Sequence, residues 1–265
     1  MNDDQLINKK FHILQRNKII RDSERFIYKE IGNRINDSLE GLNLSIEKCL
    51  EIGFASNNIY KYILNRSKNI NYSVLDISKD LLISLPKSVN SFCVDHDKWT
   101  LKKNQFNLII SNFYLHLTNN IDKLLCNINL SLKNNGFFIA SIPSNSNLIE
   151  LKNVMLSTDL KLYGGAYRRF QDNLSVQSIS KLLKKNNFKD LLIDIDTLNF
   201  QYENFQKLLS DIKNLGNSYV FIDRKKKFEN KQYFKKAEEI YWKKFSKNNK
   251  LNLTFDIIYF SGWKV

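Results

Sequence analysis

Short apolar runs alternate with helical periodicity along the first part of the chain. Runs of about four to eight apolar residues predict strands at 45–52, 72–75, 91–94, 106–110 and 137–142. The periodicity between these runs predicts helices at 59–64, 79–85 and 122–132. The run 106–110 is apolar apart from Asn107, which suits a strand covered on both faces. Strands that alternate with helices indicate an α/β protein with a mostly parallel sheet and right-handed crossovers.

The two ends of the chain extend this pattern. A helix is predicted over about 11–39, where Ile27, Ile31 and Ile35 share one apolar stripe. The second half predicts a loop at 161–170, helices at 147–156, 175–185, 205–215 and 231–245, and strands at 191–197 and 251–260, so the sheet is expected to have seven strands. We therefore expect a helical segment, 1–40, and one domain, 41–265, with an acceptor- or partner-recognition insertion at about 145–250 before its last strand.

The segment 49–56 (Cys-Leu-Glu-Ile-Gly-Phe-Ala-Ser) is the most informative motif. It predicts a buried strand that ends in a tight turn and opens a helix, and Asp76 closes the next predicted strand. Such a turn lets a ligand approach the backbone, and the later carboxylate can accept hydrogen bonds from ribose hydroxyls. The acid before the glycine, Glu51, favours the S-adenosylmethionine (SAM) form of this site over the dinucleotide form. Only Gly53 is present where such turns usually carry two or three glycines, so a purely structural turn is the alternative.

The chain of 265 residues carries a formal net charge of +14. Lysine is scattered over predicted helix faces and turns, whereas a nucleic-acid patch concentrates charge on one element with interleaved aromatic residues. The densest cluster, 224–227, is best interpreted as part of a solvated helical face. We expect weak non-specific attraction to polyanions and no specific nucleic-acid partner.

Membrane and secreted classes are not supported by the sequence. No apolar run approaches the roughly 20 residues of a bilayer-spanning helix, so no transmembrane segment is expected. The acidic first residues do not fit a secretory or transit peptide. Cys49, Cys93 and Cys126 are widely spaced in apolar surroundings, without metal-ligand or disulfide spacing. The expected location is therefore cytoplasmic, with reduced thiols.

A resemblance to a known family covers nearly the whole chain. The run 110–117 (Ile-Ser-Asn-Phe-Tyr-Leu-His-Leu), Asp122 and the turn 132–138 resemble the fourth and fifth strand region of class I SAM-dependent methyltransferases. The resemblance implies a Rossmann-like α/β fold with SAM as cofactor. The segments 205–216 and 253–264 resemble one subgroup. It contains the malonyl-carrier-protein O-methyltransferase of biotin synthesis and the mitochondrial complex I assembly factor credited with arginine hydroxylation.

The branch within this subgroup is indicated by the two ends of the chain. The helix 21–34 and the Gly-Trp-Lys end at 262–264 favour the assembly-factor branch. Because no transit peptide is recognised, a bacterial relative of that factor is the natural interpretation. The partner it implies is a protein or a carrier-protein-bound acceptor.

The resemblance assigns the first turn to the cofactor. Glu51, Gly53 and Ala55 match the turn that approaches the methionine part of SAM. The family usually has further glycines here, whereas this chain has Phe54 and Ala55. Side chains in this turn crowd the space in which a ligand's carboxylate meets backbone amides. Weakened or lost SAM binding therefore stays an alternative.

The resemblance also assigns the next three strand ends. Asp76 matches the acid that accepts hydrogen bonds from the ribose hydroxyls, with Ile77 beside the adenine. Asp95 and His96 match the third strand end, where the adenine amino edge is read. Asn112 matches a position that lines the methionine end after the fourth strand.

A loop in the second half is the predicted acceptor site. Tyr167, Arg168 and Arg169 follow two glycines and would form a cationic mouth for an acidic acceptor, with solvated surface as the alternative. Methyl transfer from a sulfonium is an in-line displacement, in which placement of the acceptor supplies most of the acceleration. A carboxylate acceptor needs no general base. No catalytic pair is recognisable, and the histidines form no pattern typical of a metal site, so no metal is predicted.

Three functions remain open at this point. The chain is a methyltransferase that acts on a carboxylate or a protein side chain, or an assembly factor that modifies or chaperones a respiratory-complex subunit, or a binding protein that has lost SAM. Hydroxylation is implied by the resemblance alone.

Overall fold

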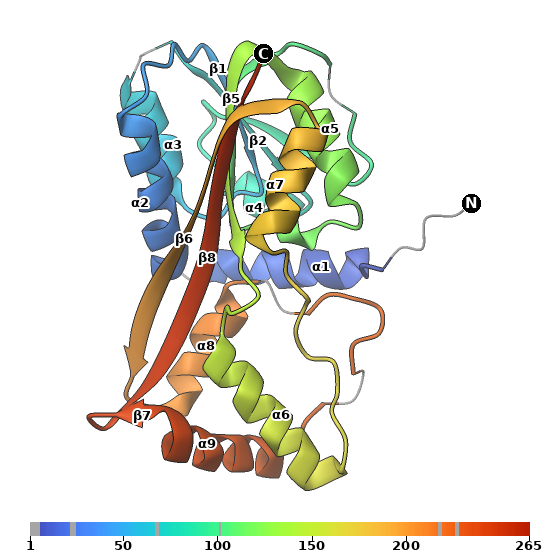
Figure 1. Cartoon of the computed structure of the whole chain (residues 1–265), viewed down its shortest axis with the longest axis vertical. Coiled ribbons are helices and arrows are strands. Elements are labelled where there is room, and N and C mark those ends of the chain that lie inside the picture. Colours follow the sequence, from blue (N-terminus) through green and yellow to red (C-terminus); the bar gives the residue numbers. More distant parts are fainter. Residues whose placement is uncertain (1–5, 22–24, 67–68, 101, 217–218, 226–227) are drawn as a thin grey trace.

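A twisted central sheet with helices on both faces forms the upper part of the molecule (Figure 1). The computed structural model describes residues 6–21, 25–66, 69–100, 102–216, 219–225 and 228–265. The strands are β1 (Lys48–Ile52), β2 (Asn71–Asp76), β3 (Asn90–Cys93), β4 (Phe106–Asn112), β5 (Leu132–Pro143), β6 (Phe188–Tyr202), β7 (Ser246–Lys247) and β8 (Lys250–Lys264). Their order is β3-β2-β1-β4-β5-β8-β6, and β7 pairs with β8 off this path.

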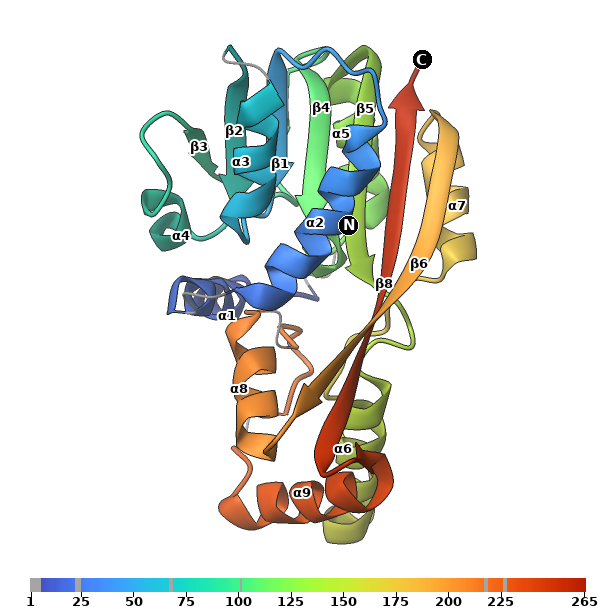
Figure 2. The ribbon, with the colours of Figure 1, turned by 90° about the vertical axis from the view of Figure 1, so that its left-hand side faces the viewer.

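The predicted α/β class is confirmed by this sheet. β1 to β5 pair in parallel, and β8 pairs antiparallel with both β5 and β6. Seven strands form the main path, as predicted, and the two-residue β7 makes an eighth. β6 and β8 are longer than predicted because each continues beyond the sheet, where the two remain paired with each other (Figure 2).

Both faces of the central strands β1, β2 and β4 are buried, which explains their nearly continuous apolar runs. On one face, α2 (Phe26–Glu40) and α3 (Asn57–Arg66) cover Cys49 and its neighbours. On the other face, α5 (Ile121–Ser131) and α7 (Val176–Lys185) cover Leu50 and Ile52. A short helix, α4 (Lys79–Ile83), follows β2.

The single N-terminal helix predicted over 11–39 is wrong. The segment forms α1 (Lys9–Arg16), a 3-10 turn (Asn17–Arg21) and α2. Arg25, at the start of α2, has a left-handed backbone with φ of 44°, which a continuous helix does not allow. As a result α1 does not continue along α2 but lies crosswise beneath the carboxyl ends of the strands (Figures 1 and 2).

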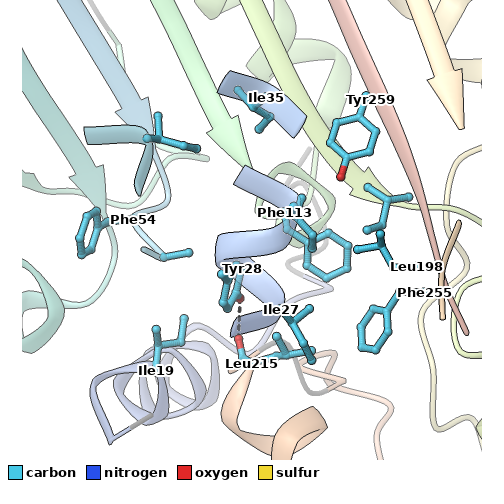
Figure 3. Packing of buried hydrophobic residues seen from close by; sticks show 14 of the residues in the cluster. Ile19, Ile27, Tyr28, Ile35, Phe54, Phe113, Leu198, Leu215, Phe255 and Tyr259 are labelled. Atoms are coloured by element: carbon cyan, nitrogen blue, oxygen red, sulfur yellow. Dashed lines mark hydrogen bonds between the residues drawn. The ribbon is translucent and has the colours of Figure 1, made fainter. Parts of the chain in front are cut away.

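The lower part of the molecule consists of helices gathered around the extended ends of β6 and β8. They are α6 (Ile149–Tyr163), α8 (Phe205–Asn214) and α9 (Lys231–Phe245). The region predicted as one insertion, 145–250, is thus spread over two places, because β6 is the edge strand of the central sheet and α7 packs against its face. The Tyr28 hydroxyl of α2 donates to the Leu215 carbonyl at 2.5 Å and ties the two parts together (Figure 3). No helix of the described residues is long and apolar enough to cross a membrane.

Candidate active site

The turn after β1 requires glycine at position 53. Gly53 has φ of +81°, and its amide donates to the Leu75 carbonyl at 2.8 Å. A Cβ atom here would lie 2.0 Å from Cγ of Tyr114, a residue of the loop after β4. The space that the sequence analysis assigned to a ligand is therefore occupied by the Tyr114 ring.

Glu51 lies at the centre of the sheet, paired in register with strand neighbours on both sides. Its side chain is fully buried, and Oε2 accepts a hydrogen bond from the Tyr72 hydroxyl at 2.7 Å. Oε1 has no hydrogen-bond partner among the described residues. Burial raises the pKa of Glu51 to about 8, so the carboxyl group is mostly protonated at neutral pH. Ala55, two residues after the turn glycine, is also buried.

Asp76 ends β2, and both of its carboxylate oxygens are engaged. Oδ1 accepts from the Ser78 amide at 2.8 Å. Oδ2 accepts from the Phe54 amide at 3.1 Å and from Nη2 of Arg16 at 2.5 Å. Arg16 thus lies where the ribose hydroxyls of a nucleoside are predicted to bind. Ile77, the predicted adenine neighbour, is buried next to this pair.

Arg16 comes from α1 and is a residue that the sequence analysis missed. Its side chain is 0% exposed, Nη2 also donates to the Phe54 carbonyl at 2.6 Å, and the guanidinium carbon lies 4.7 Å from the centre of the Tyr114 ring. Burial disfavours its charge, but the Asp76 carboxylate outweighs burial and raises the pKa of Arg16. An arginine in the last turn of an amphipathic helix is typical of exposed positions. No local pattern therefore singled it out.

The carboxylates after β3 are bound by a second cation from α1. Nζ of Lys9 lies 2.8 Å from Asp95 and 2.5 Å from Asp97. Asp97 also accepts hydrogen bonds from the Thr118 hydroxyl and the Asn119 amide, which anchors the loop after β4. The predicted adenine-side acid, Asp95, is therefore covered by the same helix as Asp76.

His96 is buried beneath α1, and both of its ring nitrogens take part in hydrogen bonds. Nε2 lies 2.9 Å from the Leu117 carbonyl, and Nδ1 lies 2.9 Å from the Tyr114 hydroxyl. A carbonyl can only accept, so Nε2 carries the proton and Nδ1 accepts from the tyrosine. Asp95, His96 and Asp97 form the one carboxylate–histidine cluster of the described chain with ligand atoms within 4.8 Å. His96 has no free lone pair for a metal in this arrangement.

Asn112, at the end of β4, binds α2 instead of facing open space. Its Nδ2 donates to the Tyr28 carbonyl at 3.1 Å, and its Oδ1 accepts from the Ser141 hydroxyl at 3.4 Å. The next residue, Phe113, has φ of 53°, a conformation that bulky residues rarely adopt. Such outliers are frequent at ligand sites. Phe113 turns the chain toward an internal cavity.

This cavity, of about 290 Å³, lies between the strand ends and the lower helices. Its wall is mainly apolar, with contributions from Phe113, Leu148, Leu151, Met155, Ile212 and Phe255. His116, Lys152 and Lys213 add polar groups. Burial lowers the pKa of His116 to about 3, so its ring is neutral. The predicted cofactor residues are not among its walls. No local sequence pattern indicates the cavity, because its walls come from segments far apart in the chain.

The three predicted acceptor residues separate in the structure. Arg169 lines the cavity, but it is bound by Asp159 at 2.5 Å and Glu229 at 2.5 Å and lies over the Tyr233 ring. Arg168 faces solvent with 54% of its side chain exposed and pairs with exposed carboxylates. Tyr167 is 45% exposed beside Arg169. Only Arg169 belongs to the cavity, and its charge is already compensated.

The predicted cofactor groove at the strand ends has the acceptor carboxylates of a nucleoside site but not the space for a nucleoside. Gly53, Asp76 and Asp95 lie at successive strand ends, where open α/β sheets bind ligands. Arg16, Lys9 and Tyr114 occupy the volume in front of them. A nucleoside fits these residues only if α1 and the Tyr114 ring withdraw.

Comparisons with known proteins agree with this architecture. A family model described as a methyltransferase domain matches residues 50–140, from β1 into β5. The chain is 26% identical over 262 residues to "Arginine-hydroxylase NDUFAF5, mitochondrial" of Dictyostelium discoideum. This match includes 90% of the present chain but only 59% of the length of the Dictyostelium protein. The chain is 25% identical over 242 residues to malonyl-(acyl-carrier protein) O-methyltransferase 2 of Ilyobacter polytropus, with 89% of this chain and 88% of the relative covered.

A solved structure extends the likeness to the whole fold. The plantazolicin methyltransferase BpumL, in complex with S-adenosylhomocysteine (SAH), superposes with a TM-score of 0.53 at 12% identity, covering 97% of this chain and 96% of the other. The likeness in fold therefore includes the lower helices. In sheet order, family match and relatives, the chain is thus similar to class I SAM-dependent methyltransferases.

Proposed function

We propose that this chain transfers a methyl group from SAM to an acceptor that enters the apolar cavity beneath the strand ends. The observation that carries the proposal is the position of the loop after β4. Within four residues, Phe113 and His116 line the cavity while Tyr114 contacts the Gly53 turn. One loop thus separates the predicted cofactor groove from the cavity, as a transfer between two adjacent ligands requires.

The cofactor assignments made from the sequence complete the proposal. Asp76 accepts hydrogen bonds from the ribose hydroxyls once Arg16 has moved, and Asp95 and the adjacent backbone hold the adenine edge. Gly53, with Glu51 behind it, borders the methionine part. When bound, SAM supplies an electrophilic methyl group on a sulfonium. The residues of this chain orient that group and exclude water from the cavity.

The cavity favours an acceptor with an apolar stem and an anionic group. Lys152 and Lys213 line it, and neither takes part in an ion pair among the described residues. The pKa of Lys152 is lowered by burial, so a nearby anion would stabilise its charged form. Neutral His116 is a weak base, which suits a carboxylate nucleophile that needs no deprotonation.

We place the chain first in the assembly-factor branch, as a protein that modifies a respiratory-complex subunit. Its support is the match to the Dictyostelium relative over 90% of this chain. Methylation of a carrier-protein-bound malonyl carboxylate is the second candidate, and Lys152 and Lys213 at the cavity favour it. For hydroxylation, His96 would have to give up a hydrogen bond before it could bind a metal.

A non-catalytic binding role is the third candidate. It is favoured by one observation, the buried Arg16–Asp76 pair in the predicted ribose position. A protein that had lost SAM would retain such a pair permanently.

Two adjacent residues of α6 test the proposal. Met155 lines the cavity and is 8% exposed, whereas Leu156 is 45% exposed. Met155→Trp should fill the cavity and reduce methyl transfer to added malonyl-carrier protein or subunit peptide by at least about tenfold, with SAH affinity retained. Leu156→Trp should leave both unchanged. Equal transfer by the two variants would place the acceptor elsewhere. If SAH does not bind any form in calorimetry, the non-catalytic role is correct.

A further inference from the structure

Helix α1 closes the groove with contacts that imitate those of a ligand. The guanidinium of Arg16 donates to Asp76 and to the Phe54 carbonyl, and it stacks on Tyr114. Lys9, two turns earlier, neutralises Asp95 and Asp97. The acids that the sequence predicts for ribose and adenine are therefore both bound by cations of one helix.

The closed arrangement leaves several buried polar atoms unpaired. Nε and Nη1 of Arg16, both ring nitrogens of His12 and Oε1 of Glu51 have no hydrogen-bond partner among the described residues. Buried polar groups without partners are unfavourable and rare in stable cores. Of the eleven buried side-chain nitrogen and oxygen atoms without a partner among the described residues, four belong to α1, which has only eight residues. Unpaired polar atoms are thus concentrated on this helix, as expected of an element that moves.

The same helix is attached to the wall of the acceptor cavity. The Asn8 amide donates to the Val220 carbonyl at 2.9 Å, and the Ile222 amide donates to the Leu6 carbonyl at 2.8 Å. At the other end of α1, a Cβ atom on Gly216 would lie 2.5 Å from the Gln15 carbonyl oxygen. Leu215 and Tyr219, from the segment that these contacts hold, line the cavity. A displacement of α1 would release this wall.

We propose that α1 is a displaceable cover, in which Arg16 competes with the SAM ribose for Asp76, so that cofactor binding frees the part of the acceptor cavity wall formed by Leu215 and Tyr219. The inference rests on the proposed function, because it assigns SAM to this groove. Binding of SAM would replace the Arg16–Asp76 bond with ribose hydroxyl bonds and move α1 away. Binding of the cofactor and binding of the acceptor are then coupled through one helix. By thermodynamic linkage, the acceptor must raise the affinity for SAM by the same factor as SAM raises the affinity for the acceptor.

Calorimetric titration of the full chain with SAH tests the competition. Arg16→Gln removes the competing cation, so SAH should bind at least about tenfold more tightly than to the wild type, because the open form is no longer a minor state. Lys10→Gln removes one charge from the exposed face of the same helix and should leave the affinity unchanged. Weaker SAH binding by Arg16→Gln overturns the inference, since Arg16 would then contact the cofactor.

Hydrogen exchange on the wild type provides a test that needs no variant. With saturating SAH, the amides of 9–16 and 219–222 should exchange faster, whereas a ligand that packs against α1 would slow them. Slower exchange with SAH bound overturns the cover and leaves the methyltransferase proposal standing. Absence of SAH binding to the wild type and to folded Arg16→Gln overturns both.

Discussion

Arg16 and Asp76 form an ion pair in which neither side chain is exposed to solvent. Such pairs contribute little net stability, because the desolvation of two charges offsets their attraction. They are nevertheless sensitive to the loss of one partner, which leaves a buried charge alone. At the scale of single residues, replacing either Arg16 or Asp76 alone is therefore expected to lower the free energy of unfolding strongly.

Asp76→Asn should lower the free energy of unfolding by about 3–5 kcal/mol, because Arg16 would keep its charge without a carboxylate. Urea unfolding followed by circular dichroism measures this change. The double variant Arg16→Met/Asp76→Asn should lose less than the sum of the two single variants. Additive losses would mean that the pair does not exist in solution.

Glu51 makes stability depend on pH. Its pKa is raised by burial from 4.5 to about 8, so between these values the unfolded chain binds fewer protons than the folded chain. The stabilisation is complete below about pH 4.5, falls by about 1.4 kcal/mol per pH unit, and is lost once the pH passes about 8. Glu51→Gln removes this dependence. The unfolding free energy of Glu51→Gln relative to wild type should therefore rise between about pH 5 and 8; a constant difference would rule out a raised pKa.

At the scale of elements, the turn after β1 and the loop after β4 interlock. Gly53 contributes a left-handed backbone, and Tyr114 contributes the ring that packs on it. Both segments follow strands that pair in parallel, so their carboxyl ends meet at one edge. The glycine turn from which a ligand site was predicted thus contacts the loop after β4 in this structure.

A comparison of Gly53→Ala with Gly164→Ala separates the contact between Gly53 and the Tyr114 ring from the strain of a left-handed backbone. The added methyl group would overlap the Tyr114 ring, so a loss of more than about 3 kcal/mol in unfolding free energy is expected. Gly164 has a similar φ of +68° with nothing within 4 Å, so Gly164→Ala should cost only about 1–2 kcal/mol of left-handed strain. Equal losses in thermal or urea unfolding would show that Tyr114 does not occupy the turn.

At the scale of the whole molecule, two groups of helices are joined by long strands and a few polar links. β6 and β8 run from the sheet into the lower helices (Figure 2). The cavity lined by Phe113, Leu151 and Phe255 lies between the two parts. Arg169 links Asp159 of α6 to Glu229, just before α9. The shape of the cavity therefore depends on this network.

Arg169→Gln should lower the unfolding free energy by about 1–3 kcal/mol, because it leaves Asp159 without its cation, although Glu229 keeps Lys225 at 2.7 Å. Arg168→Gln, at an exposed neighbour, should change it little. Neither variant should alter SAH affinity, since both residues lie outside the groove. A loss of SAH affinity in Arg169→Gln would assign this network to the cofactor site.

Local pattern was sufficient for the elements of the sheet. β1, β2 and β4 could be predicted because their side chains are buried on both faces of the sheet, so each appears as an apolar run that needs no knowledge of its neighbours. The break between α1 and α2 could not, because both helices are amphipathic and the direction of the second is set by packing against the sheet.

The sequence by itself determined the α/β fold and the strand ends at which Gly53, Asp76 and Asp95 lie, because periodicity and motif spacing are local properties. Only the tertiary structure decided what those residues touch. Arg16 lies 60 positions from Asp76, and the cavity walls span much of the chain. Contacts of this kind depend on how separate elements pack, and a helix arginine that binds a buried acid has the same sequence surroundings as one that faces water.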